Sequence, residues 1–308
     1  MRKLARAPLR SLIKALLATG QGLRLVNLAH GALTPAARRR FFHLCMDPAW
    51  RVEGRWSLDF AGRRIVLTLS RDFADAWAAA IGFHGYDPEV HALYERLVRC
   101  PRPPRVVFDV GANYGLHALR FLVHGARVVA FEPNPACHRW IRAWCEVNGV
   151  RCDLEPAAVG ACADSVVLAF PEGRTWMGSV RPDVHAGWQD AAVHTLAVPQ
   201  VTLDDVVAER GLVPDLVKID TEGAELGVLQ GAAKLLRTAA PIVVFESWPD
   251  AAERRALWDT LVVEHRYAIA AIDGTRPRPL TRAGFVGAHP TNFVAEVLPG
   301  RVIHSARQ

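Results

Sequence analysis

Between residues 106 and 297 the chain alternates between short apolar runs and longer segments with helical periodicity, and this alternation constrains the fold more than any other feature. Strands that alternate with helices form crossover units, which build a mostly parallel sheet covered by helices on both faces. The predicted strands are Val106–Val110, Arg127–Phe131, Asp153–Val159, Leu216–Ile219, Pro241–Phe245, Tyr267–Ile272 and Asn292–Val297. The predicted helices are Leu116–Val123, Pro135–Asn148, Leu203–Arg210, Ala224–Leu236 and Ala251–Glu264. Ligands of such sheets bind beyond the carboxyl ends of the strands, so polar residues there are the candidates for function.

The segment VVFDVGANYG ends the first of these strands and contains Asp109, Gly111 and Gly115. Glycine lets the backbone approach a ligand, and the helix that we expect to begin near Tyr114 offers free N–H groups and a positive dipole end. The spacing is D-x-G-x-x-x-G, whereas a dinucleotide site has G-x-G-x-x-G. A carboxylate before the first glycine would repel a pyrophosphate, but it suits the ammonium and sulfonium groups of S-adenosylmethionine. This methyl donor therefore fits the turn better than NAD does.

The second strand ends in VVAFEPNP, which places Glu132 23 residues after Asp109. An acidic residue at this position can accept hydrogen bonds from both ribose hydroxyls of a nucleotide cofactor. The alternative is an acid that only stabilises the start of the helix after Pro133 and Pro135.

The segment DLVKIDTEGAELGVLQGA, from Asp215 to Ala232, gathers charge at the end of the fourth strand. Alternation in a strand places Lys218 and Asp220 on the same side. A buried lysine needs a partner, and the neighbouring carboxylates supply several. Alternatively, Asp220 and Glu222 only cap the helix that follows.

Five segments, VVFDVGANYG, VVAFEPNP, VTLDDVV, LVKIDTEGAELGVLQGA and PIVVFE, occur in the order seen in the FkbM-type methyltransferase family, which this chain resembles over about residues 84–297. The resemblance implies an α/β fold of the S-adenosylmethionine-dependent class I, a Rossmann-like, seven-stranded, mostly parallel sheet with a reversed last strand. It also implies a methyltransferase that acts on a hydroxyl of a sugar, glycan or other secondary metabolite. The implied cofactor site comprises Asp109, Gly111, Ala112, Asn113, Gly115, Glu132, Pro133 and Asn134. Lys218, Asp220 and Glu222 belong to the strand-four motif, beside the site of methyl transfer.

A hydroxyl must lose its proton when it accepts a methyl group. We expect Asp220 or Glu222 to act as the general base, with Lys218 holding the carboxylate in place, and His117 is a second candidate base. We expect no metal ion. The alternative is a divalent cation held by Asp220, Glu222 and Glu246 at the ends of adjacent strands.

Residues 1–100 are predicted to form a basic helical and β-hairpin extension, and residues 101–308 the methyltransferase domain, with the stiff CPRPPR segment at the boundary. The hairpin is expected over residues 55–70, around Ala61-Gly62. Residues 161–201 interrupt the alternation as a β-rich insertion, either a cover over the substrate or a plain hairpin. Its two tryptophans, in WMGS (176–179) and HAGWQD, could stack on a sugar face.

The positive charge is unevenly placed. Residues 1–46 carry nine Lys/Arg and no acid, which leaves 28 basic against 31 acidic residues in the rest of the chain. Such an acidic body argues against a nucleic-acid partner. In this N-terminal arm one helical face carries Leu9, Leu12, Ile13, Leu16 and Leu17. The helix therefore either packs on the domain or contacts anionic lipid or a phosphorylated substrate. With the tryptophans, this suggests a glycosyl acceptor that is lipid-linked or nucleotide-linked.

No cysteine pair has CxxC spacing, so the six cysteines are interpreted as reduced thiols of a cytoplasmic protein, with membrane association as the alternative. Two other functions stay open: a non-catalytic nucleotide-binding module on the same fold, and an NAD-dependent oxidoreductase.

Overall fold

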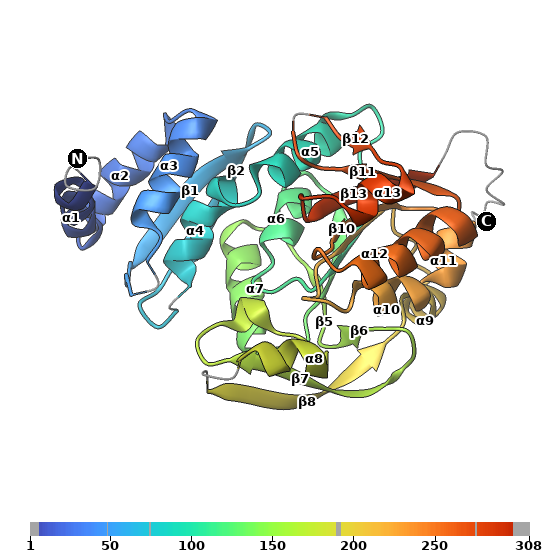
Figure 1. Ribbon diagram of the computed structural model, residues 1–308. Helices are drawn as coiled ribbons and strands as arrows, with labels where there is room; N and C mark the ends of the chain where they lie inside the picture. Colours follow the sequence, from blue (N-terminus) through green and yellow to red (C-terminus); the bar gives the residue numbers. More distant parts are fainter. Residues whose placement is uncertain (1–5, 48, 74, 189–191, 275, 298–308) are drawn as a thin grey trace.

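The computed structural model describes residues 6–47, 49–73, 75–188, 192–274 and 276–297, and its centre is a sheet of eight strands (Figure 1). Across the sheet the order is β12 (Arg278–Pro279), β11 (Tyr267–Ala271), β13 (Asn292–Val297), β10 (Ile242–Glu246), β9 (Leu216–Ile219), β3 (Val106–Val110), β4 (Arg127–Phe131) and β5 (Asp153–Glu155). The pairs from β10 to β5 are parallel, whereas β13 runs antiparallel to both β10 and β11. The predicted seven strands are therefore present, and the short β12 adds an edge.

Two hydrophobic clusters cover the two faces of this sheet. Neighbouring residues of β3 divide between them, Val107 in one and Phe108 in the other, as the alternation of side chains in a buried strand requires. The first cluster includes residues of α5 (Pro88–Arg99), α6 (Leu116–Leu122) and α7 (Pro135–Val147). The second includes residues of α9 (Leu203–Arg210), α10 (Glu225–Gln230), α11 (Ala233–Thr238), α12 (Ala251–Trp258) and α13 (Arg282–Val286).

Three predicted elements are divided in the structure. The strand expected over 153–159 breaks at Pro156, which cannot donate to a ladder, and β6 (Ala158–Val159) joins a different sheet. The helix expected over 224–236 breaks at Gly231, where a Cβ atom would lie 2.0 Å from the carbonyl oxygen of Gly160. The helix expected over 251–264 continues after Trp258 as a π-helix, η3 (Asp259–Glu264).

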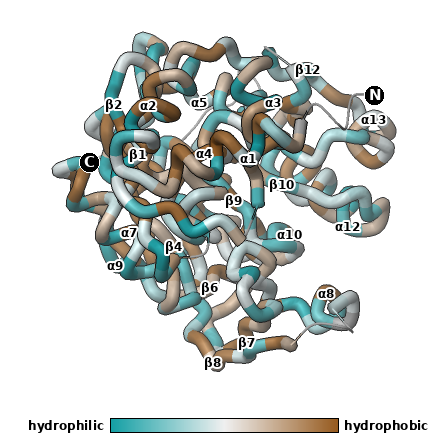
Figure 2. Tube along the Cα trace, turned by 90° about the vertical axis from the view of Figure 1, so that its left-hand side faces the viewer, coloured by the Kyte–Doolittle hydropathy of each residue, from teal (hydrophilic) through white to brown (hydrophobic). Residues whose placement is uncertain are grey.

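The N-terminal layer, residues 6–99, contains the predicted hairpin. Strands β1 (Gly54–Phe60) and β2 (Arg63–Leu69) pair antiparallel around Ala61 and Gly62, which both have positive φ (52° and 86°), as a type I′ turn requires. The other elements are α1 (Arg6–Leu17), α2 (Gly20–Gly31), α3 (Pro35–Cys45) and α4 (Ala76–Gly85). Helix α4 is a mostly hydrophobic stretch of the chain (Figure 2) and has buried residues on several sides.

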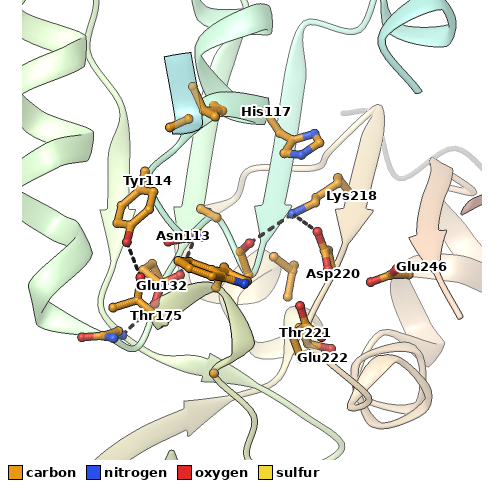
Figure 3. A pocket seen from close by; sticks show the side chains of 18 of the residues that line it. Asn113, Tyr114, His117, Glu132, Thr175, Lys218, Asp220, Thr221, Glu222 and Glu246 are labelled. Carbon is orange, nitrogen blue, oxygen red and sulfur yellow. Dashed lines mark hydrogen bonds and ion pairs between the residues drawn. The ribbon is translucent and has the colours of Figure 1, made fainter. Parts of the chain in front are cut away.

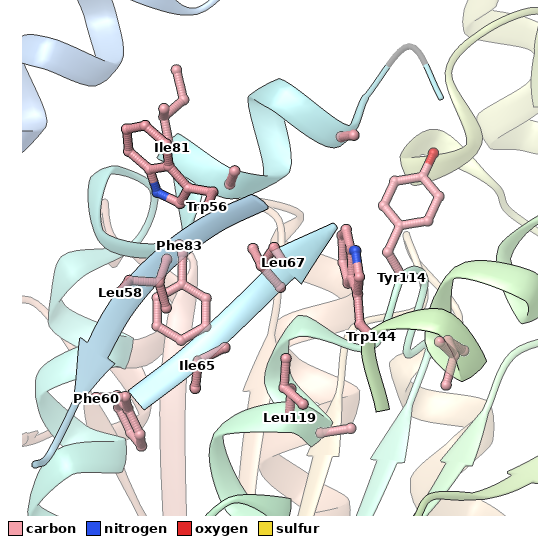
Figure 4. Packing of buried hydrophobic residues seen from close by; sticks show 14 of the residues in the cluster. Trp56, Leu58, Phe60, Ile65, Leu67, Ile81, Phe83, Tyr114, Leu119 and Trp144 are labelled. Carbon is pink, nitrogen blue, oxygen red and sulfur yellow. The ribbon is translucent and has the colours of Figure 1, made fainter. Parts of the chain in front are cut away.

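This layer packs on α6 and α7. Trp56, Ile65 and Phe83 share one buried cluster with Leu119 and Trp144 (Figure 4). The indole N–H of Trp144 donates to the carbonyl oxygen of Thr68 at 3.0 Å. The hydrophobic cluster is therefore continuous across residues 100–105, and the boundary between two domains at that segment stays a prediction.

Helix α1 lies at the outer end of this layer (Figure 1). Only part of its predicted apolar face packs against the protein. Ile13 and Leu17 are buried, whereas Leu9 and Leu12 are exposed by 50% and 57%. Among the helices that the structure describes, none is long and apolar enough to cross a lipid bilayer.

The insertion is a three-stranded sheet of order β6–β8–β7 with short helices between its two long strands. It contains β7 (Asp164–Pro171), η1 (Thr175–Met177), α8 (Pro182–His185), η2 (Ala186–Trp188) and β8 (Val193–Val201). It lies below the carboxyl ends of the central strands in Figure 1, so it can close one side of a site there.

Candidate active site

A cavity of about 640 Å³ opens at the carboxyl ends of β3, β4, β9 and β10 (Figure 3). Its walls come from the turns after these strands, from the insertion, and from α3, α4 and α5 of the N-terminal layer. Nine of the eleven predicted site residues line it: Gly111, Ala112, Asn113, Glu132, Pro133, Asn134, Lys218, Asp220 and Glu222. Asp109 and Gly115 are not part of this lining.

The two glycines of the turn after β3 are in close contact with other parts of the protein, one with backbone and one with a side chain. Gly111 has φ 73°, and a Cβ atom there would lie 1.8 Å from the carbonyl oxygen of Asp220. Gly115 has φ 79° and caps α6, where a Cβ atom would lie 3.3 Å from Ile141. The turn therefore needs glycine for its left-handed conformation and for close packing on the end of β9. Asn113, which also has positive φ (48°), completes the turn.

Glu132 joins the turns after β3 and β4. Its carboxylate accepts hydrogen bonds from the backbone N–H groups of Asn113 at 2.6 Å and Asn134 at 2.8 Å. Burial raises the pKa of Glu132 to about 7, although these two hydrogen bonds oppose the shift. The Oδ1 atom of Asn134 caps α7, and its buried Nδ2 has no hydrogen-bond partner among the described residues. A free donor beside a carboxylate with remaining lone pairs fits the hydroxyls and nitrogens of a nucleoside such as that of S-adenosylmethionine.

Lys218 is buried at the end of β9 and connects the turn after β3 to the acidic segment Asp220–Glu222 (Figure 3). Its Nζ lies 3.3 Å from Asp109 Oδ1 and 3.4 Å from Asp220 Oδ2, and it donates to the carbonyl oxygen of Gly111 at 3.0 Å. Burial disfavours its charged form, but attraction to Asp220 and Asp109 outweighs burial and raises the pKa of Lys218. It is therefore a fixed cation.

Asp109 is almost fully buried and is not part of the cavity lining. One oxygen lies beside Lys218, and the other accepts a hydrogen bond from the N–H of Ala118 at 2.9 Å in the first turn of α6. The sequence interpretation gave Asp109 a direct attraction to the cofactor's cationic groups. Its position instead lets it hold Lys218 and the start of α6 in place.

The far end of the cavity is acidic. Asp220, Glu222 and Glu246 each offer a carboxylate oxygen, and these atoms lie within 4.8 Å of one another, so the three could hold a divalent cation. Burial and then repulsion from Asp220 raise the pKa of Glu222 to about 8 and that of Glu246 to about 9. Burial and then Glu89 raise the pKa of Asp87, a further lining residue, to about 6. Sequence reasoning missed Asp87, because no local pattern indicates that it lies in the same cavity as Asp220 and Glu246.

His117 also lines the cavity and lies beside Lys218 (Figure 3). Burial, followed by repulsion from Lys218 and Arg120, holds the pKa of His117 well below its usual range. Its imidazole is therefore neutral and weakly basic at pH 7, which weakens His117 as a candidate base relative to the two predicted carboxylates, Asp220 and Glu222.

The insertion contacts both the acidic segment after β9 and the turn after β3. Ser179 Oγ donates to the carbonyl oxygen of Glu222 at 2.8 Å. The hydroxyl of Tyr114 donates to Asp75 Oδ2 at 2.7 Å and is also hydrogen-bonded to Thr175. Nothing in the sequence pattern indicated that Tyr114 joins three segments that are far apart in the chain.

The two tryptophans of the insertion take different positions. Trp176 lines the cavity and is 41% exposed, so it is available to a ligand. Trp188 is not part of the lining and stacks on His185, with ring centroids 5.3 Å apart. The expected pair of stacking tryptophans is therefore reduced to one in the described cavity.

The strand order, with the reversed β13 between β10 and β11, and the cavity at the strand ends define an α/β fold of the class I methyltransferases. The chain belongs to the FkbM methyltransferase family, whose domain matches residues 109–269. It is 34% identical over 156 residues to the 31-O-demethyl-FK506 methyltransferase FkbM of Streptomyces tacrolimicus, and this alignment covers 42% of the chain and 60% of that relative.

The chain also resembles a number of solved structures, and two of them show the degree of likeness. One is methyltransferase FkbM from Methylobacillus flagellatus, with 14% identity, a TM-score of 0.44, and coverage of 84% of this chain and 58% of that one. The other is a 16S rRNA N2 G1207 methyltransferase of T. thermophilus in complex with AdoMet and guanosine, with 16% identity, a TM-score of 0.44, and coverage of 80% and 50%.

Proposed function

We propose that this protein transfers a methyl group from S-adenosylmethionine to a hydroxyl of a small molecule, either a sugar, a glycan or another secondary metabolite. One observation carries the proposal. A single cavity is lined by the turns after β3 and β4 at one end and by Asp220, Glu222 and Glu246 at the other. Lys218 connects these two ends by contacting Gly111 and Asp220.

In this proposal S-adenosylmethionine supplies the electrophilic methyl group, and the chain supplies position and a proton acceptor. Asn134 Nδ2 and Glu132 would hold the nucleoside, since both line the cavity and retain hydrogen-bonding capacity. Orientation of the two reactants alone can contribute on the order of 7–11 kcal/mol to the lowering of the barrier. Asp220 would accept the hydroxyl proton on its carboxylate, while Lys218, 3.4 Å away, keeps that carboxylate in place.

The name of the curated relative describes transfer to an oxygen atom, which supports O-methylation here. The D-x-G-x-x-x-G turn and the acidic cavity both disfavour the pyrophosphate of NAD, and therefore an oxidoreductase. A non-catalytic nucleotide-binding module would have no need of the carboxylates gathered at the far end of the cavity.

We further propose that the acceptor is not a nucleic acid, since the chain beyond residue 46 has more acidic than basic residues. A cytoplasmic protein with peripheral membrane contact is consistent with α1 and α2, which expose Leu9, Leu12, Leu25 and Leu28 within the basic N-terminal arm. Co-sedimentation with vesicles of anionic and of neutral lipid tests this contact. Equal recovery of the protein in the supernatant with both kinds of vesicle would contradict the proposed membrane contact.

Calorimetric titration with S-adenosylmethionine, with NAD as the control ligand, tests the proposed function. We expect micromolar binding of the methyl donor, no binding of NAD, and at least about a tenfold loss in Glu132→Gln, equal to about 1.4 kcal/mol. Glu209→Gln, at an exposed position on α9, is the matched control and should bind like the parent protein. Binding of NAD, or of neither ligand, would overturn the proposal.

A further inference from the structure

We infer that α3, α4 and α5 of the N-terminal layer form the acceptor subsite, that this subsite takes a partly apolar, hydroxyl-bearing molecule without negative charge, and that Gly82 sets the size it accepts. The inference rests on the proposed function, because it assigns the part of the same cavity that the cofactor turns do not occupy. It gives a role to a segment in which the sequence showed no motif.

The wall on this side of the cavity is apolar and accessible. It is lined by Phe42 of α3 and Met46 just after that helix, by Gly82 of α4 and Tyr86 just after that helix, and by Val90 of α5. Met46 and Tyr86 are exposed by 48% and 66%. Large apolar side chains that gather exposed at a cavity often mark a binding site for a ligand or partner. An acceptor bound here would have its apolar part against these side chains and its hydroxyl toward Asp220, which lines the same cavity.

Gly82 leaves space that the protein itself does not use. It lies inside α4 on the side of Ala78 and Ala79, which also line the cavity. A Cβ atom at Gly82 would meet Phe42 at 3.5 Å and Tyr86 at 3.8 Å, both ordinary contacts. Gly85, by contrast, could not carry a Cβ atom, which would lie 2.4 Å from Phe42.

Glycine inside a helix is less favourable than alanine by about 1 kcal/mol. Packing therefore explains Gly85 but not Gly82. A larger side chain at Gly82 would extend into the cavity. We therefore assign to this position the control of which acceptors fit.

The charge of the lining selects against anionic acceptors. It contains seven carboxyl groups against three permanent cations. The raised pKa values of Glu222 and Glu246 leave these two mostly protonated at pH 7, so the ionised acids come from the other five (Asp75, Asp87, Glu132, Glu172 and Asp220) and the cations are Arg120, Arg174 and Lys218. Lys218 already pairs with Asp109 and Asp220, and two nitrogens of the Arg120 guanidinium donate to the carbonyl oxygens of Leu116 and Phe83. The basic α1 lies at the outer end of the N-terminal layer (Figure 1) and does not line the cavity. A phosphorylated or nucleotide-linked acceptor, which the basic arm had suggested, is therefore disfavoured here.

Two fluorescent probes test the inference without knowledge of the acceptor. N-phenyl-1-naphthylamine is neutral, and 8-anilinonaphthalene-1-sulfonate has the same arylamine body with a sulfonate added. Each is titrated into the protein in the presence of S-adenosylhomocysteine. We expect the neutral probe to bind with at least about tenfold higher affinity than the sulfonate.

Gly82→Leu should weaken the neutral probe by at least about tenfold, and Gly82→Ala by less. Gly31→Leu is the matched control, because a side chain at Gly31 in α2 meets nothing within 4 Å, and it should bind like the parent. Gly82→Ala should also melt at or above the melting temperature of the parent, which would establish that α4 tolerates a side chain at this position. If the leucine variant does not fold, the affinity of Gly82→Ala for the neutral probe tests the inference instead.

Equal affinity of the parent and both Gly82 variants for the neutral probe, or tighter binding of the sulfonate, would overturn the inference. Its failure is distinguishable from failure of the proposed function, which calorimetry with S-adenosylmethionine reports separately. If S-adenosylmethionine binds but the Gly82 variants bind the probe like the parent, the proposed function stands and the acceptor subsite is overturned. If Gly82→Leu loses the probe but the protein does not bind S-adenosylmethionine, the subsite stands and the proposed function is overturned.

Discussion

The half of the cavity beside Glu132 is built largely from the backbone of two short turns, whereas the half beside Gly82 is built from side chains of α3, α4 and α5 and of the ends of β9 and β10. In the first half, N–H groups of consecutive residues bond to Glu132 and to the carbonyl oxygen of Phe131. In the second, Phe42 and Glu246 are about two hundred residues apart in the chain. We therefore expect substitutions of side chains to leave the backbone contacts of the first half unchanged. In the second half, a single substitution of a lining side chain should be enough to alter which ligand binds.

Lys218→Met should have the largest effect on stability, because Lys218 joins the two halves. Its removal would leave Asp109 buried beside no cation, and breaking a buried ion pair typically lowers the free energy of unfolding by about 3–5 kcal/mol. Lys234→Met, at an exposed lysine of α11, is the matched control and should stay within about 0.5 kcal/mol of the parent. Urea unfolding at pH 7 measures both. If the two methionine variants were equally stable, Lys218 would not be the connection that we describe.

Asp220→Asn should have the next largest effect, on turnover. The asparagine side chain keeps the shape but cannot accept a proton, so kcat should fall by about 10²–10⁴ with an acceptor identified by screening. The affinity for S-adenosylmethionine, set by the other half of the cavity, should stay within about twofold. Asp72→Asn, at an exposed position, is the control. Full turnover in both Asp220→Asn and Glu222→Gln would exclude the acidic half from the chemistry.

Glu246→Gln should change the dependence of stability on pH. Burial and Asp220 raise the pKa of Glu246 from 4.5 to about 9, so between these values the folded state binds a proton that the unfolded state lacks. The parent should therefore lose stability as pH rises through this window, by up to about 1.4 kcal/mol per pH unit for one such group. The glutamine variant should show a flatter slope and exceed the parent in stability at pH 8.5. Parallel slopes in urea unfolding at pH 5.5, 7 and 8.5 would contradict the assigned protonation.

Removal of divalent metal should have the smallest effect. We expect exhaustive EDTA treatment to change turnover by less than about twofold, because Asp220 can act as the base without a cation. Loss of activity with EDTA and recovery with Mg²⁺ would instead make Asp220, Glu222 and Glu246 a metal site, and the acidic half would then hold an ion rather than accept a proton.

The same contrast explains how much the sequence predicted. The central strands and the residues of the first half follow from local patterns, since each turn is a continuous segment, with glycines after β3 and an acid followed by prolines after β4. The reversed β13 was predicted by the family resemblance alone. The second half depends on how the N-terminal layer packs on α6 and α7, which no local pattern encodes. Asp87 and Gly82 therefore could not be found from the sequence. The break at Pro156 has a local signal that sequence reasoning overlooked, because proline cannot donate to a ladder. The break at Gly231 was missed because it reflects the approach of Gly160, which is a long-range event.

The hydroxyl of Tyr114 has a consequence for protein engineering. It is hydrogen-bonded to Asp75 of the N-terminal layer and to Thr175 of the insertion, while Tyr114 itself belongs to the turn after β3. A chimera that receives the N-terminal layer of a relative in order to gain a new acceptor would replace one member of this trio and keep the other two. The natural cassette for exchange is therefore the layer together with the insertion, and a donor that lacks a matching acid at position 75 would need its own residues at positions 114 and 175.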